Sequence, residues 1–171
     1  MSTAEQFGNF ASTNMIQEAT AFKTVKAGSY DIQVSKVYEM NIEEGFARVG
    51  ANVVSEGQKR GMVFFRIQWT EKRNSNGKLA AGCKLYAQML KALHPSATLD
   101  ELSKIDAATL LNEAEKYPVS AFISEYYSVK DDSNPPYTTS RRYPKSPEEV
   151  KAVLSEGGIA KNDVVSIYAK K

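Results

Sequence analysis

The chain has 171 residues, of which 42% are apolar and 25% are charged, with a formal net charge of +2. This composition is ordinary for a soluble globular protein. The single cysteine, Cys83, excludes an internal disulfide and a cysteine-based zinc site, and its apolar helical surroundings predict a buried structural thiol. The length predicts one domain, residues 26–171, that buries a core of its own after an arm of residues 1–25.

No basic segment followed by an apolar run opens the chain, and no stretch of about 18 apolar residues occurs. We therefore expect a soluble, intracellular protein without membrane contact. The arm carries apolar residues at spacings too loose for a helix. We expect it to be partly ordered and to pack on the body or on a neighbouring subunit, which makes homo-oligomerisation through the arm a hypothesis.

The positive charge is concentrated in one part of the chain. Residues 48–95 hold nine lysines and arginines against two acids, a local charge of +7, whereas residues 1–47 hold three lysines against six acids, a local charge of −3. Such an uneven distribution predicts a polyanionic partner. Solvated strand edges and loops remain the alternative explanation.

Alternation of apolar and polar residues predicts two strands before residue 56. In the first, Tyr30, Ile32 and Val34 mark the buried side. A polar turn at residues 41–45 separates it from a second strand over about Phe46–Ser55.

The third strand, Gly61–Trp69, has two contrasting faces. Its apolar face consists of Val63, Phe65, Ile67 and Trp69, and its other face of Met62, Phe64, Arg66 and Gln68. A strand that buries one side and exposes rings with cations suits a single-stranded nucleic acid, because bases stack on rings and cations meet phosphates. The connection before it, residues 56–61, has two glycines and two cations, which predicts a mobile basic hairpin tip.

Helical patterns follow the turn at residues 74–77. One covers Leu85–Leu93 and ends at His94–Pro95, a capping box at residues 98–101 opens a short second helix, and a third covers about Ala107–Lys116.

Two further strands are predicted, over Val119–Val129 and Tyr137–Tyr143, with a loop between them. A helix then begins at Ser146–Pro147 and ends at two glycines, and the tail from Asp163 is a strand or a short helix. This order predicts a mostly β fold with inserted helices. We expect a five-stranded barrel like the oligonucleotide-binding (OB) fold, with helices between strands three and four and near the C-terminus.

Residue patterns typical of a catalytic site are weak in this sequence. The one histidine, His94, precedes a proline at a helix end, which favours a capping role. Metal-ligand spacing and glycine-rich phosphate loops do not occur, and the adjacent acid pairs fit solvation and capping. We therefore expect a protein that is not an enzyme and needs no cofactor or metal, although a small nuclease stays a third hypothesis.

The residues that we predict to bind single-stranded DNA combine stacking rings with cations that neutralise phosphates. They are Arg48, Lys59, Arg60, Phe64, Arg66, Lys72, Arg73, Phe122, Tyr126, Tyr137, Arg141, Arg142 and Tyr143. For Phe64 and Phe122, burial beneath the inserted helices is the alternative.

Three segments resemble the bacteriophage single-stranded DNA-binding proteins that use one OB fold per subunit. They are Lys26–Ile32, Gly61–Trp69 with the helix ending near His94, and Tyr117–Phe122 with the strand Tyr137–Tyr143. The resemblance covers about residues 26–145. It implies binding of single-stranded DNA with little sequence preference, during phage DNA replication or recombination. It also implies replication or recombination proteins as partners. It also implies a location in the cytoplasm of the infected or host bacterial cell.

The resemblance does not extend to the C-terminus, because many such proteins end in an acidic tail that recruits partners, whereas this chain ends in Lys170–Lys171. A competing hypothesis is a phage-encoded interaction protein that inhibits or recruits a host DNA-processing enzyme through its basic surface.

Overall fold

The computed structural model describes residues 25–55, 61–131 and 138–170, together with Phe10, Ser12 and Met15. Within this part, strands dominate and three helices are inserted between the third and fourth strands. In chain order the elements are β1 (Gly28–Asn41), β2 (Phe46–Val53), β3 (Met62–Gln68), α3 (Ala81–Leu93), α4 (Leu99–Ser103), α5 (Ala107–Lys116), β4 (Val119–Asp131), β5 (Thr138–Arg142), α6 (Pro147–Ser155) and β6 (Ile159–Tyr168). The predicted mostly β fold with inserted helices is confirmed.

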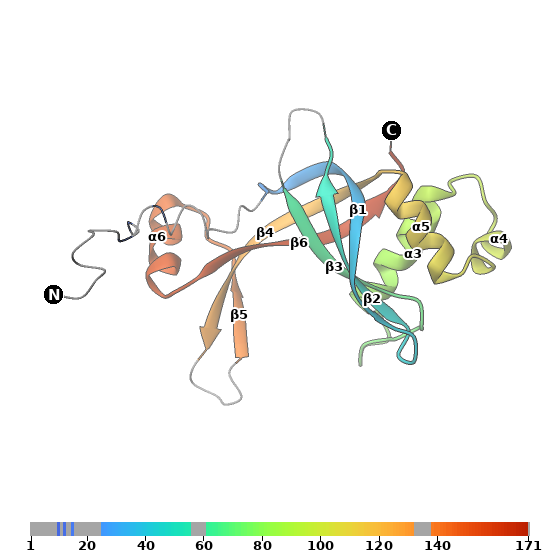
Figure 1. The fold of residues 1–171 in the computed structure, drawn as a ribbon. Helices are drawn as coiled ribbons and strands as arrows, with labels where there is room; N and C mark the ends of the chain where they lie inside the picture. Colours follow the sequence, from blue (N-terminus) through green and yellow to red (C-terminus); the bar gives the residue numbers. More distant parts are fainter. Residues whose placement is uncertain are drawn as a thin grey trace.

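The strands form one antiparallel sheet of order β3-β2-β1-β4-β5, with β6 paired to β4. The long strand β4 pairs with β1 over residues 119–123, with β5 over residues 127–131, and with β6 over residues 120–128. Strands β4 and β6 therefore run side by side through the length of the molecule (Figure 1). Helices α3, α4 and α5 gather at one end of this pair, and α6 lies at the other end.

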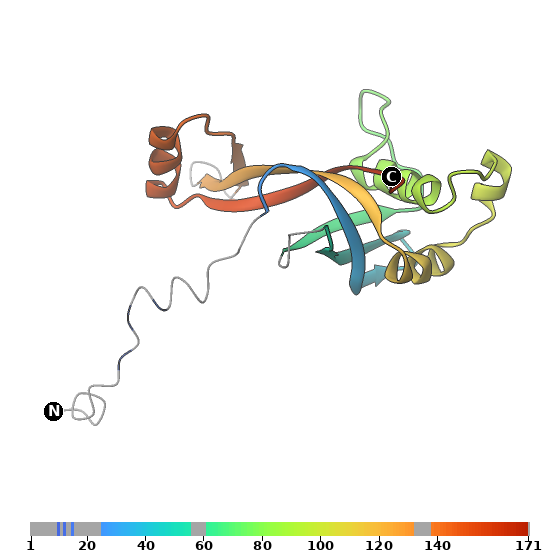
Figure 2. The same ribbon diagram turned by 90° about the horizontal axis from the view of Figure 1, so that it is seen from above.

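One face of the sheet is buried, as the alternating patterns predicted. On this inner face, Ile32, Ile67 and Ile123 are fully buried, and Met89 of α3 and Leu110 of α5 complete the same apolar cluster. The view from above shows α3 and α5 beside the sheet (Figure 2). The opposite side of the same strands is called the outer face below; it carries Arg48, Phe64, Arg66, Phe122 and Tyr126, whose sequence neighbours point inward.

Helix α3 lies between the edges of β3 and β6. Near its start, a Cβ on Gly82 would lie 3.4 Å from the carbonyl oxygen of Arg66 on β3, so helix and strand are in close contact. Further along, Gln88 Oε1 accepts a hydrogen bond of 2.9 Å from the backbone N–H of Ile167 on β6. A side chain thus takes the place of a neighbouring strand, and the six-stranded sheet is not closed into a barrel.

The C-terminal tail is the sixth strand, and it begins four residues before the predicted position, at Ile159. Its pairing with β4 shifts register between Phe122 and Ile123, which leaves Val165 as an extra residue. Because a bulge breaks the period of two, the sequence alternation did not distinguish this strand from a short helix.

The helix starts follow the predicted caps. Thr98 and Glu101 form the capping box of α4, and Ser146 accepts from the N–H of Glu149 with Pro147 in the first turn of α6. Asp106 caps α5 by accepting a 2.8 Å bond from the N–H of Thr109, and this bonding lowers the pKa of its carboxyl group. None of the described helices is long and apolar enough to cross a membrane.

The described body begins at Val25, which is buried. The backbone N–H of Val25 donates to Asn162 Oδ1 at 2.8 Å, and Asn162 Nδ2 donates to the carbonyl of Val25 at 2.7 Å. One side chain of β6 therefore binds both backbone groups of Val25. The predicted arm, apart from Phe10, Ser12, Met15 and Val25, lies outside the described residues. The predicted hairpin tip at residues 56–60 and the loop at residues 132–137 also lie outside them.

The core predicts a large difference between two leucines on neighbouring helices. Leu110 is 0% exposed and Leu99 is 86% exposed. We expect Leu110→Ala to lower the free energy of unfolding by about 2–5 kcal/mol, because it removes buried contacts and leaves a cavity. The control Leu99→Ala should change it by less than about 0.5 kcal/mol. Urea denaturation followed by circular dichroism measures both; equal effects would contradict the assignment of the core.

Candidate nucleic-acid interface

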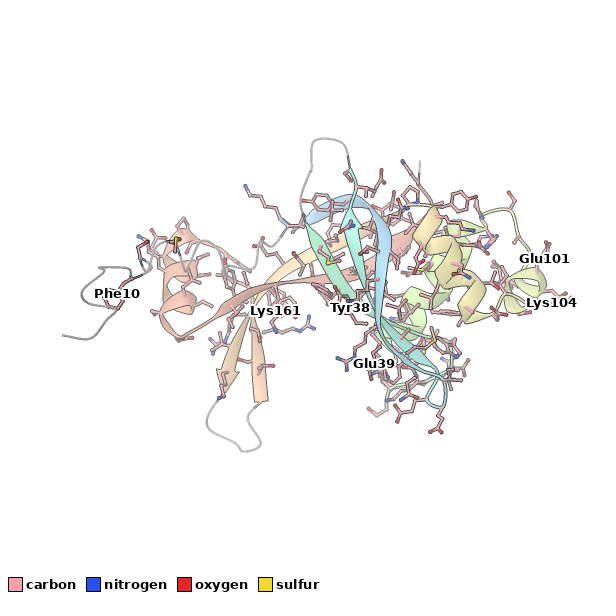
Figure 3. All side chains as sticks on the ribbon, in the orientation of Figure 1. Phe10, Tyr38, Glu39, Glu101, Lys104 and Lys161 are labelled. Atoms are coloured by element: carbon pink, nitrogen blue, oxygen red, sulfur yellow. The ribbon has the colours of Figure 1, made fainter. Side chains whose placement is uncertain are left out.

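Two aromatic side chains form a contact on the outer face of β1 and β3. The ring centroids of Tyr38 and Phe64 lie 5.5 Å apart at an interplanar angle of 57°, and each residue is half exposed. Lys36 Nζ lies 4.9 Å from the centroid of the Tyr38 ring, and the Tyr38 hydroxyl lies 3.8 Å from Met62 Sδ. We call this cluster of Lys36, Tyr38, Met62 and Phe64 the Tyr38 platform. Tyr38 projects from the middle of the sheet (Figure 3).

Tyr38 was not among the predicted residues, because simple alternation places it on the buried side with Ile32 and Val34. In the structure, β1 has two register shifts against β2, between Val34 and Lys36 and between Val37 and Glu39. Each shift inserts an extra residue and re-aims the side chains that follow. Local residue patterns give no signal for these shifts, because they depend on pairing with β2.

Gly50 forms the floor of the Tyr38 platform. It pairs with Phe64 on one side and with Lys36 on the other. A Cβ at this position would lie 2.7 Å from Cε2 of Tyr38 and 3.3 Å from both Cε1 of Phe64 and Cε of Met62. The missing side chain therefore lets the two rings lie close to the sheet.

Two arginines face each other next to this platform. Arg48 on β2 lies directly opposite Arg66 on β3, and both line a groove of about 470 Å³ together with Tyr38 and Phe64. Like charges at such positions repel, since cross-strand Cβ atoms are only about 4.5–5.5 Å apart. Glu39 balances one of them, at 3.2 Å from Arg48 Nε. The groove therefore keeps a net positive charge.

The second arginine is held by a ring. The guanidinium carbon of Arg66 lies 3.8 Å from the centroid of Phe46, whose ring is buried beneath it. Arg66 Nη2 donates weakly to Gln68 Oε1 at 3.4 Å, whereas Nε is buried without a hydrogen-bond partner among the described residues. The stacking fixes the plane of the guanidinium where it lines the groove.

A second aromatic cluster lies on β4, β5 and the segment after β5. Tyr126 and Tyr143 have ring centroids 6.5 Å apart, and the guanidinium carbon of Arg141 lies 4.2 Å from the Tyr126 centroid. Arg141 Nη1 donates to Asp163 Oδ2 at 3.0 Å. Hydrogen bonding to Asp163 and then to Tyr143 raises the pKa of Arg141 above its ordinary value. We call Tyr126, Arg141, Tyr143 and Asp163 the Tyr143 platform.

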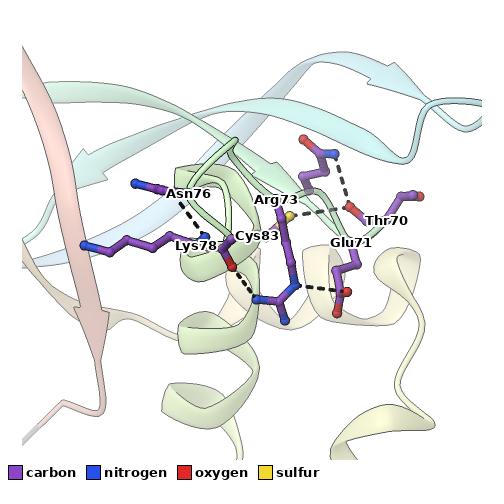
Figure 4. A network of polar contacts seen from close by, with 8 residues as sticks. Thr70, Glu71, Arg73, Asn76, Lys78 and Cys83 are labelled. Carbon is purple, nitrogen blue, oxygen red and sulfur yellow. Dashed lines mark hydrogen bonds and ion pairs between the residues drawn. The ribbon is translucent and has the colours of Figure 1, made fainter.

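Other predicted cations are separated from these clusters. Arg142 pairs with Tyr127, so it points to the opposite side of β5 from Arg141. Arg73 lies in the loop between β3 and α3, where its guanidinium contacts Glu71 at 3.3 Å and donates to the carbonyl of Gly77 at 2.9 Å (Figure 4). It holds that loop together, and Lys72 is exposed beside it. Lys59, Arg60 and Tyr137 lie outside the described residues.

The single histidine and the single cysteine both make contacts within the fold. His94 Nε2 lies 2.5 Å from Glu113 Oε2 and links the end of α3 to α5, and the buried Cys83 thiol donates to the carbonyl of Thr70 at 3.4 Å. In the described ranges, no group of three or more His, Cys, Asp or Glu side chains could hold a metal ion.

Comparisons with protein-family models, with curated proteins and with solved structures gave no match. The function must therefore be argued from the two platforms and the arginine groove.

The floor of the Tyr38 platform gives a test that needs no ligand. Gly50→Ala should push the rings of Tyr38 and Phe64 apart, because the new methyl group would otherwise lie 2.7 Å from Tyr38. We expect clear shifts of the Met62 ε-methyl and Tyr38 ring signals in NMR spectra. The control Gly28→Ala adds a methyl group whose nearest contact is 3.6 Å, and should leave both signals in place. Unchanged signals in Gly50→Ala would contradict the proposed packing.

Proposed function

We propose that this protein is a non-catalytic single-stranded DNA-binding protein with little sequence preference, acting in phage DNA replication or recombination. The observation that carries the proposal is the arginine groove beside the Tyr38 platform. Two half-exposed rings, Tyr38 and Phe64, share one face with two directly opposed arginines, Arg48 and Arg66. The rings offer stacking surfaces and the arginines offer charge to the backbone that joins the stacked bases.

The chemistry of this face favours unpaired bases. An exposed ring can stack only on a base whose own face is free, and such stacking contributes about 1–3 kcal/mol per base whatever the base. A phosphate between Arg48 and Arg66 would relieve their repulsion, and its oxygens match the planar donor fork of a guanidinium. The partly buried setting of Arg66 makes this contact stronger than one at a fully exposed cation.

We further propose that the sheet is an open variant of the OB arrangement. Supporting this are the β1-β2-β3 meander, the helix inserted after β3, the return of β4 to β1, and the approach of β6 toward β3 beside α3. In OB folds the face of strands two and three binds oligonucleotides. Here β2 carries Arg48, and β3 carries Phe64 and Arg66.

The proposal can be tested by fluorescence anisotropy with a labelled 12-nucleotide oligo(dT) at several salt concentrations. The logarithm of the binding constant should fall linearly with the logarithm of salt concentration, with a slope of about −0.7 per neutralised phosphate. Arg48→Ala should make this slope shallower by about 0.7, the contribution of one neutralised phosphate. Phe64→Ala should weaken binding by about 1–3 kcal/mol and leave the slope unchanged, because stacking releases no counterions.

Arg48 is the better arginine for this test, because removing Arg66 would also uncover the buried ring of Phe46. The control Lys84→Ala removes an exposed cation from α3 and should change neither affinity nor slope. Absence of oligonucleotide binding at low salt would overturn the proposal. That outcome would favour a protein that inhibits or recruits a host DNA-processing enzyme through the same basic groove.

A further inference from the structure

The two platforms lie on the same face of one sheet, at opposite ends of it. The Tyr38 platform lies over β1, β2 and β3, and the Tyr143 platform lies over β4 and β5. We propose that one continuous single strand contacts both platforms, so that full affinity needs a ligand long enough to span them. This inference rests on the proposed function and adds to it a second contact region and a minimum ligand length.

Mostly polar side chains occupy the sheet face between the platforms. Ser29 on β1 pairs with Phe122 on β4, and Ser120 and Ser124 stand two residues to either side of Phe122 on the same face of β4. Phe122 itself is 42% exposed. This lane, defined by Ser29, Ser120, Phe122 and Ser124, offers one intermediate stacking surface, with Tyr168 of β6 opposite Ser120.

The register gives the length of the path. Lys36, opposite Gly50, and Ser29, opposite Phe122, are seven residues apart on β1, and Phe122 and Tyr126 are four residues apart on β4. At ~3.3 Å per residue, these eleven steps correspond to about 35 Å along the strands. A stacked strand with ~3.4 Å per nucleotide would need about 10 nucleotides, and an extended strand fewer, within the range of ~4–16 for one OB fold.

The polarity of the lane indicates which side of the ligand faces the protein. A hollow of about 440 Å³ beside it is lined by hydroxyl groups and one carboxylate, from Ser29, Tyr30, Asp31, Ser55, Ser120 and Tyr168. The Asp31 carboxylate accepts from Ser120 Oγ at 2.8 Å and lies 3.7 Å from Lys170 Nζ. A carboxylate does not attract phosphate but accepts hydrogen bonds from base N–H groups. The bases therefore face the sheet here, with the backbone outward.

The Tyr143 platform binds less tightly than the Tyr38 platform when each acts alone. Arg141 already donates to Asp163 and covers one face of Tyr126, so a phosphate must replace a carboxylate there. Beside the Tyr38 platform, two arginines line the groove, and Arg66 has no carboxylate partner among the described residues. A short oligonucleotide therefore occupies the Tyr38 platform first, and the Tyr143 platform adds affinity only when the same strand reaches it at high local concentration.

Oligonucleotides of 4, 8, 12 and 16 thymidines, measured by anisotropy against the intact chain, test this inference. Affinity should rise on the order of 10²-fold between 4 and 12 nucleotides and then level off, because the second contact becomes intramolecular. The double variant Arg141→Ala/Tyr143→Ala should bind the 4-nucleotide ligand about as the wild type does, and should lose most of the 10²-fold gain at 12 nucleotides.

The matched control is Lys104→Ala/Tyr117→Ala. Lys104 pairs with Asp100 at 3.1 Å, as Arg141 pairs with Asp163 at 3.0 Å, and Tyr117 and Tyr143 are 60% and 58% exposed. Both control positions lie at the helical end of the molecule (Figure 3, where Lys104 is labelled). The control should bind every length as the wild type does. The inference is wrong if the platform variant keeps wild-type affinity for the 12-nucleotide ligand. It is also wrong if the variant loses the same fraction of its affinity for the 4-nucleotide and the 12-nucleotide ligand.

A second measurement uses the unaltered chain, so it does not depend on the folding of a variant. A 12-nucleotide oligo(dT) with one 5-iodouracil at either end is irradiated, and the cross-linked residues are mapped by mass spectrometry. One end should cross-link at Tyr38 or Phe64 and the other at Tyr126 or Tyr143. Cross-links of both ends to the Tyr38 platform alone would overturn the inference and leave the proposed function intact; failure of every length to bind would overturn the function itself.

Discussion

The packing of α3 on the inner face of the sheet is the constraint on which the rest of the structure depends. Met89 is fully buried against the strands, and Gln88 satisfies a backbone donor at the edge of β6. Helix α3 contacts both β3 and β6, and in the described residues these two strands approach each other without pairing, so the sheet stays open. The inner face is then fully occupied, so rings and cations at the alternate positions of the same strands must lie on the outer face.

The cations of the outer face are held in place without being tightly bound. Arg48 pairs with Glu39, Arg141 pairs with Asp163, and Arg66 stacks on Phe46. Exposed ion pairs of this kind contribute only about 0–1 kcal/mol, because water and salt screen them. Exchange of a carboxylate for a phosphate therefore costs no more than about 1 kcal/mol, while the prior contacts restrict the side chains and reduce the entropy lost on binding.

Local sequence patterns were enough to predict the elements whose geometry is local. The two faces of β3, the capping box at Thr98 and the start of α6 at Ser146 follow from residues within one turn or a few positions. Phe64 and Tyr143 are exposed, whereas Trp69, predicted in the core, is partly buried against it beside Tyr86. Local patterns did not predict the bounds of strand β6 or the open edge of the sheet, because both depend on pairings between distant segments.

The candidate site shows why register, rather than composition, makes the binding face. Nothing in the sequence near Tyr38 indicates that its ring meets Phe64, because the contact depends on the register shift between Val34 and Lys36 in β1 and on a glycine at position 50 of β2. The opposition of Arg48 and Arg66 likewise comes from the β2–β3 register, and a slip of one residue would turn one arginine toward the core. Burial of the inner face forbids that slip. The same apolar packing that stabilises the sheet therefore also fixes the spacing of rings and charges on its outer face.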